Sequence, residues 1–301
     1  MMTESQTRSA RRRGVTIAIW LATVLFMFTA AAFQRRTGPS YEYRGEYRVQ
    51  GVEYEYALIR NHETTGEAVV SLPAPADGVS GSLFQRRYPT ADAYTETPLV
   101  ASPDGMLSGS LPVQPAAGKV EYYILLQTTE GDLIIPESAP GESIILRYKD
   151  PVPLPVLLSH VFLMAFSVLF GIRAGLGAAF SPSGIRRWVW VTLTGMSVGG
   201  MLLGPIVQKF AFGEYWTGFP NGYDLTDNKT LIMWLVWVVA AAVVGRKKPE
   251  TSARSRTAVV LAALVMMVVY LIPHSYRGSQ LDYDQLDRGV PASEAVETAD
   301  S

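Results

Sequence analysis

Two histidines in apolar surroundings are the residues of this chain best suited to chemistry. His160 and His274 lie on apolar segments that flank a loop rich in aromatic and acidic residues. An imidazole can bind a metal ion or exchange a proton near neutral pH. Ionisable groups inside a membrane are costly, so they usually face the bundle interior and mark functional sites. The pair predicts a site beside the loop; hydrogen bonding to neighbouring helices is the structural alternative.

The two histidines are expected at similar depths in a membrane. A helix rises about 1.5 Å per residue, which puts His160 roughly 9 Å beyond the start of its segment at Leu154. His274 ends its own segment near the corresponding boundary. Met164 follows His160 by one helical turn and therefore shares its face. The loop must fold back at this level, which makes the three side chains candidates for one site.

The loop itself carries the other candidate residues: Tyr215, Trp216, Phe219, Asp224, Asp227 and Lys229. Tyr and Trp also favour the membrane interface, so the aromatic residues, with Trp234 and Trp237 after them, could form only an interfacial belt. The acidic end of the loop is typical of a helix start, with Thr226 or Asp227 as the N-cap. Asp224 and Lys229 would then pair with each other or with a ligand.

Five apolar segments dominate the chain, at Gly14–Phe33, Leu154–Gly171, Trp188–Val207, Leu231–Gly245 and Thr257–Ile272. A membrane span needs about 20 mainly apolar residues. No segment contains Asp, Glu, Lys or Arg. The sequence therefore predicts an α-helical integral membrane protein with five spans, in which pairs such as Gly171 and Gly175 let helices pack closely. Because a basic stretch precedes the first segment, it is either an uncleaved anchor or a cleaved signal peptide.

Residues 37–150 have a different composition, with Tyr, Val, Ile and Thr in short runs between Gly and Pro. Strands are expected at Tyr41–Gln50, Val52–Arg60, Ala68–Leu72, Gly118–Leu126, Leu133–Ile135 and Ser143–Tyr148. Short strands at such spacing are typical of a sandwich. We therefore expect an inserted all-β sandwich domain, resembling an immunoglobulin or fibronectin type III domain.

Lys and Arg are distributed unevenly around the spans, which predicts the orientation. They concentrate in residues 1–14, 172–187 and 246–256, whereas loop 208–229 has only Lys209 and Lys229. The N-terminus is then inside, in a bacterial inner membrane. The predicted parts are a basic start and anchor (1–36), an extracytoplasmic β-domain (37–150), a four-helix module with the outer aromatic loop (151–276) and an outer tail (277–301). This tail is expected to be disordered, because its end at Val290–Ser301 is small and acidic.

Composition and motifs exclude several classes of function. The absence of cysteine excludes disulfides, thiolate metal sites and covalent haem attachment. Net charge is −1, and the basic residues gather between spans, which argues against nucleic acid as a partner. The sequence has no nucleophile elbow, HExxH motif or phosphate-binding glycine loop, which favours a non-enzymatic role. The expected partners are the lipid bilayer and an extracytoplasmic protein docked on the β-domain.

The helical part resembles the haem-handling cytochrome c assembly family, over roughly residues 154–276. That family has a tryptophan-rich outer loop between spans that each carry a histidine. The matching positions are Ser159, His160, Met164 and Ser167, then Gly213, Tyr215, Trp216, Asp227, Lys229, Thr230, Leu231, Ile232, Trp234 and Leu235, and finally His274, Ser275 and Tyr276. A second tryptophan of the family's loop is missing, residues 218–225 look like an insertion, and the β-domain and the number of spans depart from the pattern.

The resemblance implies that His160 and His274 ligate a haem b near the outer face, with loop aromatics packed on the porphyrin. Imidazole pairs suit haem iron. Two alternatives remain open. One is a non-enzymatic scaffold that anchors the β-sandwich and presents it outside. The other is a quinol or ion site lined by Asp224, Asp227 and Lys229.

Overall fold

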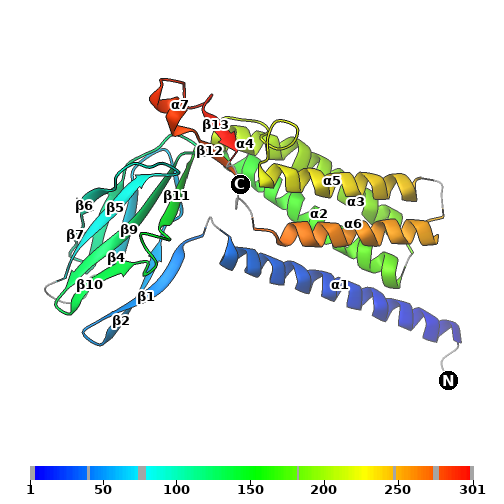
Figure 1. Cartoon of the computed structure of the whole chain (residues 1–301). Helices are drawn as coiled ribbons and strands as arrows, with labels where there is room; N and C mark the ends of the chain where they lie inside the picture. Colours follow the sequence, from blue (N-terminus) through cyan, green and yellow to red (C-terminus); the bar gives the residue numbers. More distant parts are fainter. Residues whose placement is uncertain are drawn as a thin grey trace. The chain divides into compact units, whose positions relative to one another are not determined.

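The computed structural model describes residues 4–38, 41–73, 79–181, 183–246, 249–273 and 278–298. The chain forms two compact units, drawn in Figure 1, and each is described by itself. The helical unit comes from residues 1–38, 152–208 and 218–276, and the β unit from residues 39–151, 209–217 and 277–301. The predicted outer loop 208–229 is therefore divided between the two units near Thr217.

The helices are α1 (Glu4–Thr37), α2 (Leu154–Phe180), α3 (Ile185–Met196), a π-helical segment η1 (Ser197–Leu203), α4 (Gly204–Phe212), α5 (Leu225–Val244) and α6 (Ala253–Leu271). Since α3, η1 and α4 run on as one stretch, the described residues contain five helices long and apolar enough to cross a membrane. This confirms the five predicted apolar helices, and the chain fits a multi-pass membrane protein.

Local sequence explains where several helices begin and end. Pro155 lies in the first turn of α2, where its missing N–H would have had no helical partner. The Asp224 and Ser252 side chains cap α5 and α6 by accepting hydrogen bonds from backbone N–H groups of the first turn. Gly245 ends α5 with φ of 57°, a conformation that glycine adopts at little cost.

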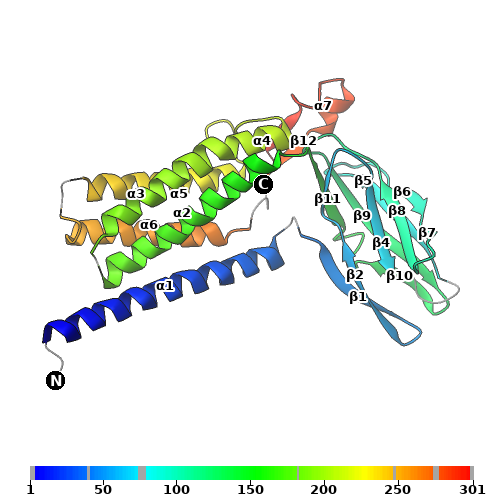
Figure 2. The same ribbon diagram turned by 180° about the vertical axis from the view of Figure 1, so that it is seen from behind.

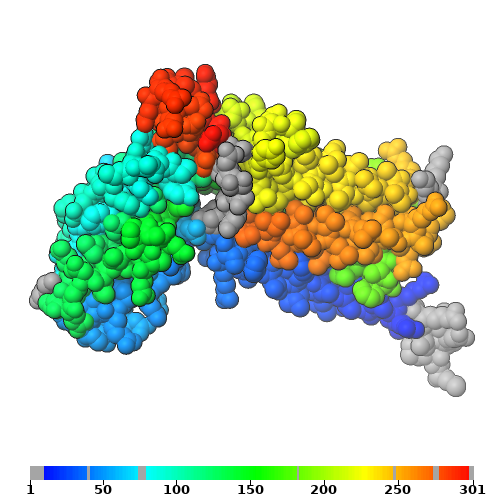
Figure 3. Space-filling view, viewed as in Figure 1, coloured from blue at the N-terminus to red at the C-terminus, as the bar shows by residue number. Residues whose placement is uncertain are grey.

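Helices α2, α3, α5 and α6 lie side by side with α1 along them, as the two views of Figures 1 and 2 show. In Figure 3, α5 and α6 run together along one face of this unit. Small residues allow the close packing that the sequence predicted: a Cβ added at Gly175 of α2 would overlap Ala263 of α6. The core around this contact includes Val168, Ile172, Met233, Trp237 and Met266.

The strands of the β unit form several small sheets. They are β1 (Tyr43–Val49), β2 (Val52–Leu58), β3 (Asn61–Glu63), β4 (Ala68–Pro73), β5 (Ser80–Arg87), β6 (Thr95–Pro98), β7 (Val100–Ala101), β8 (Met106–Leu111), β9 (Lys119–Thr128), β10 (Gly131–Ile135) and β11 (Ile144–Lys149). One sheet has the order β3-β11-β9-β5-β6 with β10 on β9, another has the order β4-β8-β7, and β1 pairs with β2. All three contribute to one core, for example through Tyr56, Leu72 and Tyr122.

The strands confirm a β-domain in this part of the chain, but its sheets are small and mixed. Most pairs are antiparallel, but β3 runs parallel to β11, with His62 opposite Tyr148. An immunoglobulin or fibronectin type III topology is not established by this order. Strand β5 was missed in the sequence because Gly81, Ser82 and the terminal arginines obscure its alternation; only pairing with β9 along its whole length defines it.

The C-terminal segment differs from the predicted disordered tail. Residues 278–298 contain β12 (Ser279–Leu281), α7 (Tyr283–Asp287) and β13 (Val296–Thr298). Leu281, Tyr283 and Ala295 form a small buried cluster. The composition is small and acidic, but contacts with distant residues of the β unit order it: Arg87 pairs with Asp287 at 2.7 Å.

Candidate functional site

His160 of α2 is held against the π-helical segment. Its Nδ1 lies 2.8 Å from the backbone carbonyl oxygen of Gly199, which also accepts the N–H of Gly204. A carbonyl oxygen only accepts hydrogen bonds, so Nδ1 is the donor, and the tautomer with its proton on Nδ1 has its lone pair on Nε2. A histidine whose Nδ1–H is fixed by a backbone carbonyl has the tautomer and orientation typical of a metal ligand.

The π-helical turn explains how the helix backbone reaches His160. In η1 the N–H of Gly204 bonds five residues back, and single π turns of this kind occur often at functional sites. Two consecutive glycines, Gly199 and Gly200, let the turn lie directly on α2. A Cβ at Gly200 would be 3.2 Å from the sulfur of Met164 and 2.8 Å from the Thr230 methyl group. His160 and Met164 thus face the same turn, as their spacing predicted.

The tryptophans of α5 belong to the helical core rather than to an interfacial belt. The Trp234 indole N–H donates to the Ser197 hydroxyl at 2.9 Å and so ties α5 to η1. Trp237 is fully buried in the core of the helical unit. The sequence suggested an interfacial position because both lie near the loop, but their faces on α5 turn toward neighbouring helices.

The acidic residues at the end of the loop accept hydrogen bonds from backbone N–H groups of the loop and of the first turn of α5. Asp224, rather than the predicted Thr226 or Asp227, is the N-cap of α5, and it accepts hydrogen bonds from the N–H groups of Thr226 and Asp227. The Asp227 carboxylate accepts the Gly218 N–H at 3.0 Å instead. The side-chain oxygen of Asn228 accepts the N–H of Phe219, the residue after Gly218, at 2.7 Å. These carboxylate and amide oxygens therefore close the loop onto the first turn of α5.

Lys229 is buried, with 4 % of its surface exposed, and does not form the predicted pair with Asp224. Its ammonium group donates to the Ile272 carbonyl oxygen at the end of α6. The last carbonyls of a helix have few partners and carry the negative end of its dipole, so a cation is favoured there. Lys229 thus joins the start of α5 to the end of α6, and this contact could not be read from the sequence between them.

The aromatic residues of the loop differ in their surroundings. Phe219 and Tyr223 are exposed, the latter at 79 %, and both lie in the helical unit. Tyr215 and Trp216 lie in the β unit, where the Lys209 ammonium group is 5.3 Å from the Tyr215 ring centre. The candidate aromatic residues of the loop are therefore divided between the two units. His274, the second candidate ligand, lies outside the described residues.

One buried charge was missed from the sequence. Arg173 was assigned to a loop after a span ending at Gly171, but α2 continues through it, and only 6 % of it is exposed. Its guanidinium lies 5.4 Å from the ring centre of Trp20 and 5.8 Å from that of Trp188. Phe170 stacks on Trp188 at 5.1 Å. An arginine among aromatic faces is stabilised by cation–π attraction, which here joins α1, α2 and α3.

Within the described residues, no group of three or more His, Asp or Glu side chains is placed to hold a metal ion by itself. The chain matches no protein-family model and no curated protein. The resemblance to cytochrome c assembly proteins consequently stays a prediction from the sequence.

Proposed function

We propose that this chain is a bacterial membrane protein that binds haem b in its helical unit, with His160 as an axial ligand. The observation that carries the proposal is the hydrogen bond from the His160 Nδ1–H to the Gly199 carbonyl. It fixes the ring and leaves the Nε2 lone pair for iron. His274 is the second ligand proposed, on the strength of the sequence.

The residues around His160 fit a haem ligand in chemistry and in setting. The ring lies on α2, which is long and apolar enough to cross a membrane. Met164, one turn away, supplies a flexible and polarisable neighbour. Bound haem would supply one-electron chemistry, whose potential depends on the axial ligands and on burial. The chain's own part is to orient His160 through Gly199 and to shield the site.

The membrane placement belongs to the same proposal. The distribution of Lys and Arg supports an inner-membrane protein with its N-terminus inside, and the β unit and C-terminus outside. In this arrangement the β unit, as a sandwich of immunoglobulin or fibronectin type, docks an extracytoplasmic protein partner. The exposed Phe219 and Tyr223 then lie at the outer face, available to a haem or to the interface.

The test is an absorption spectrum of the purified protein, oxidised and then reduced with dithionite. We expect a Soret band and sharp reduced bands that are lost in His160→Ala and in His274→Ala. His62→Ala is the matched control, because His62 lies on β3 of the β unit and should leave the spectrum unchanged. A protein that stays colourless after addition of hemin would refute the proposal.

A second function, a scaffold without a cofactor, is favoured by a specific observation. Asp224, Asp227 and Lys229 all bond to the protein's own backbone, which supports a structural role for the polar loop over a quinol or ion site. The scaffold predicts that His160→Ala changes the folded protein's stability and nothing in its visible spectrum.

A further inference from the structure

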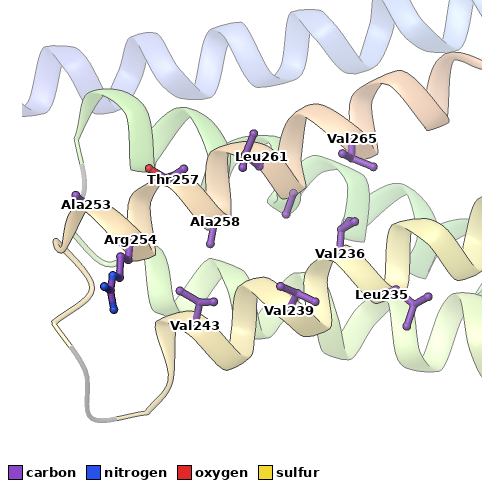
Figure 4. Close-up of a pocket in the computed structure, with 11 residues that line it drawn as sticks. Leu235, Val236, Val239, Val243, Ala253, Arg254, Thr257, Ala258, Leu261 and Val265 are labelled. Atoms are coloured by element: carbon purple, nitrogen blue, oxygen red, sulfur yellow. The ribbon is translucent and has the colours of Figure 1, made fainter.

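An apolar groove lies between α5 and α6 on the helical unit, with a volume of about 700 Å³. Figure 4 shows its two walls: Leu235, Val239 and Val243 come from α5, and Ala258 and Leu261 from α6. The groove exists because Ala258 is short opposite the branched valines of α5. Val239 and Leu261 are both more than half exposed, so this face is not closed by any other described part of the unit.

The dimensions fit a single hydrocarbon chain. The α6 wall extends from Ala253 to Val265, about 18 Å at 1.5 Å per residue. One leaflet of a bilayer is about 15 Å thick in its hydrocarbon part. The length and the apolar lining of the groove therefore suit an extended acyl chain that lies along one leaflet.

One end of the groove carries a positive charge that has no partner among the described residues. Arg254 lines that end, is exposed, and forms no hydrogen bond or ion pair with the residues that the structure describes. Its neighbour Arg256 is engaged, because it donates to the Ala178 and Ala179 carbonyls at the end of α2.

The linker before α6 does not neutralise this charge. Its one acidic residue, Glu250, accepts the backbone N–H groups of Gly184 and Arg186 at the start of α3. Arg246, Lys247 and Lys248 add further positive charge to the linker sequence. An anionic group at the membrane surface is the complement of Arg254 in this setting.

We propose that the groove binds one acyl chain of an anionic phospholipid, whose phosphate pairs with Arg254. The apolar walls take the chain, and the arginine selects the headgroup by charge. Lipid binding in this groove requires only that the helices lie in a membrane, and it does not depend on haem binding.

The test is native mass spectrometry of the full-length protein in detergent with phosphatidylglycerol or phosphatidylethanolamine at equal concentration. We expect the protein to retain phosphatidylglycerol preferentially, and Arg254→Gln to lose about fivefold in that preference, the effect of one charge near a membrane surface. Val239→Trp should reduce the retention of both lipids, because a large side chain fills the groove. It should fold, since Val239 is 59 % exposed.

Arg13→Gln is the matched control. It removes one exposed positive charge from the start of α1, at the same end of the helical unit as the α5–α6 linker. An equal loss in Arg13→Gln and Arg254→Gln would overturn the proposal, because the preference would then reflect the general surface potential. Equal retention of the two lipids would also overturn it, as would a dimer that Val239→Trp dissociates. If Val239→Trp is not monodisperse, Leu261→Phe fills the same groove and decides the question.

Discussion

Tyr283→Phe tests whether the C-terminal segment is ordered by the β unit. The Tyr283 hydroxyl accepts the backbone N–H of Lys119 at 3.0 Å and donates to the carbonyl oxygen of the same residue at 2.9 Å. The side chain is 3 % exposed, and this burial raises the pKa of the phenol to about 12. Lys119 begins β9, a central strand of the larger sheet. The hydroxyl is therefore a buried link between α7 and the sheet.

The expected size of the effect follows from what phenylalanine keeps and loses. The ring still fills its place, so little apolar contact is lost. The Lys119 N–H, however, loses the hydroxyl oxygen as its acceptor, whereas the Lys119 carbonyl oxygen still accepts the N–H of Tyr88. An unmade hydrogen bond of this kind costs about 1–3 kcal/mol. If the segment opens locally, its amide protons should exchange roughly 5- to 150-fold faster in the variant.

Hydrogen exchange followed by mass spectrometry on the full-length protein measures this directly, in peptides that cover residues 279–287. Tyr43→Phe is the control, because Tyr43 is exposed on β1 and its hydroxyl bonds to none of the described residues. The reasoning is refuted if Tyr283→Phe exchanges like the wild type. It is also refuted if the wild-type segment exchanges at the rate of an unfolded chain, as the composition alone predicted.

Three further outcomes are expected. Arg87 donates to Asp287 and lowers the pKa of that carboxyl group, so the stabilisation is fully present above the ordinary Asp pKa of about 3.9 and is lost as the pH falls through the lowered value. Pepsin should accordingly cut the C-terminal segment increasingly fast below about pH 4, and less steeply so in Arg87→Gln, where the pairing is already absent. Asp224→Ala should cost about 1 kcal/mol through loss of the α5 cap, seen as a lower midpoint of thermal unfolding, whereas Asp224→Asn keeps a capping oxygen and should change little. Trp20→Ala should lower the same midpoint by more than Leu21→Ala, because Trp20 packs on the aromatic cluster of the bundle and Leu21 is 66 % exposed; equal shifts would contradict the α1 packing.

Several features of the helical unit could be predicted because they depend on local sequence. The five helices follow from apolar length, since a bilayer of fixed thickness sets the number of residues that must lack charge. A cap at the start of α5 was also foreseen, but the choice of Asp224 over Asp227 was not. Both are good capping residues, and Asp227 has a second partner in the Gly218 N–H, which only the folded loop brings near.

The β unit was predictable only in part. Strands with clear alternation, such as Val52–Leu58, were found, whereas β5 was not, because its sequence carries little of the strand signal and its pairing with β9 supplies the rest. The folded structure of the C-terminal segment was missed because it too depends on contacts with residues distant in the sequence. Arg87 and Asp287 are distant in sequence, so no local pattern contains their contact.

By itself the sequence determined which segments can leave water, and that His160 and Met164 share one face. These properties depend on residue type and on spacings within one or two helical turns. Only the tertiary structure decided the partners: the Gly199 carbonyl for His160, the Ile272 carbonyl for Lys229, and the aromatic rings around Arg173. Each of these contacts joins residues from different helices. Their energies come from burial and hydrogen bonding across the bundle, which no spacing along one helix encodes.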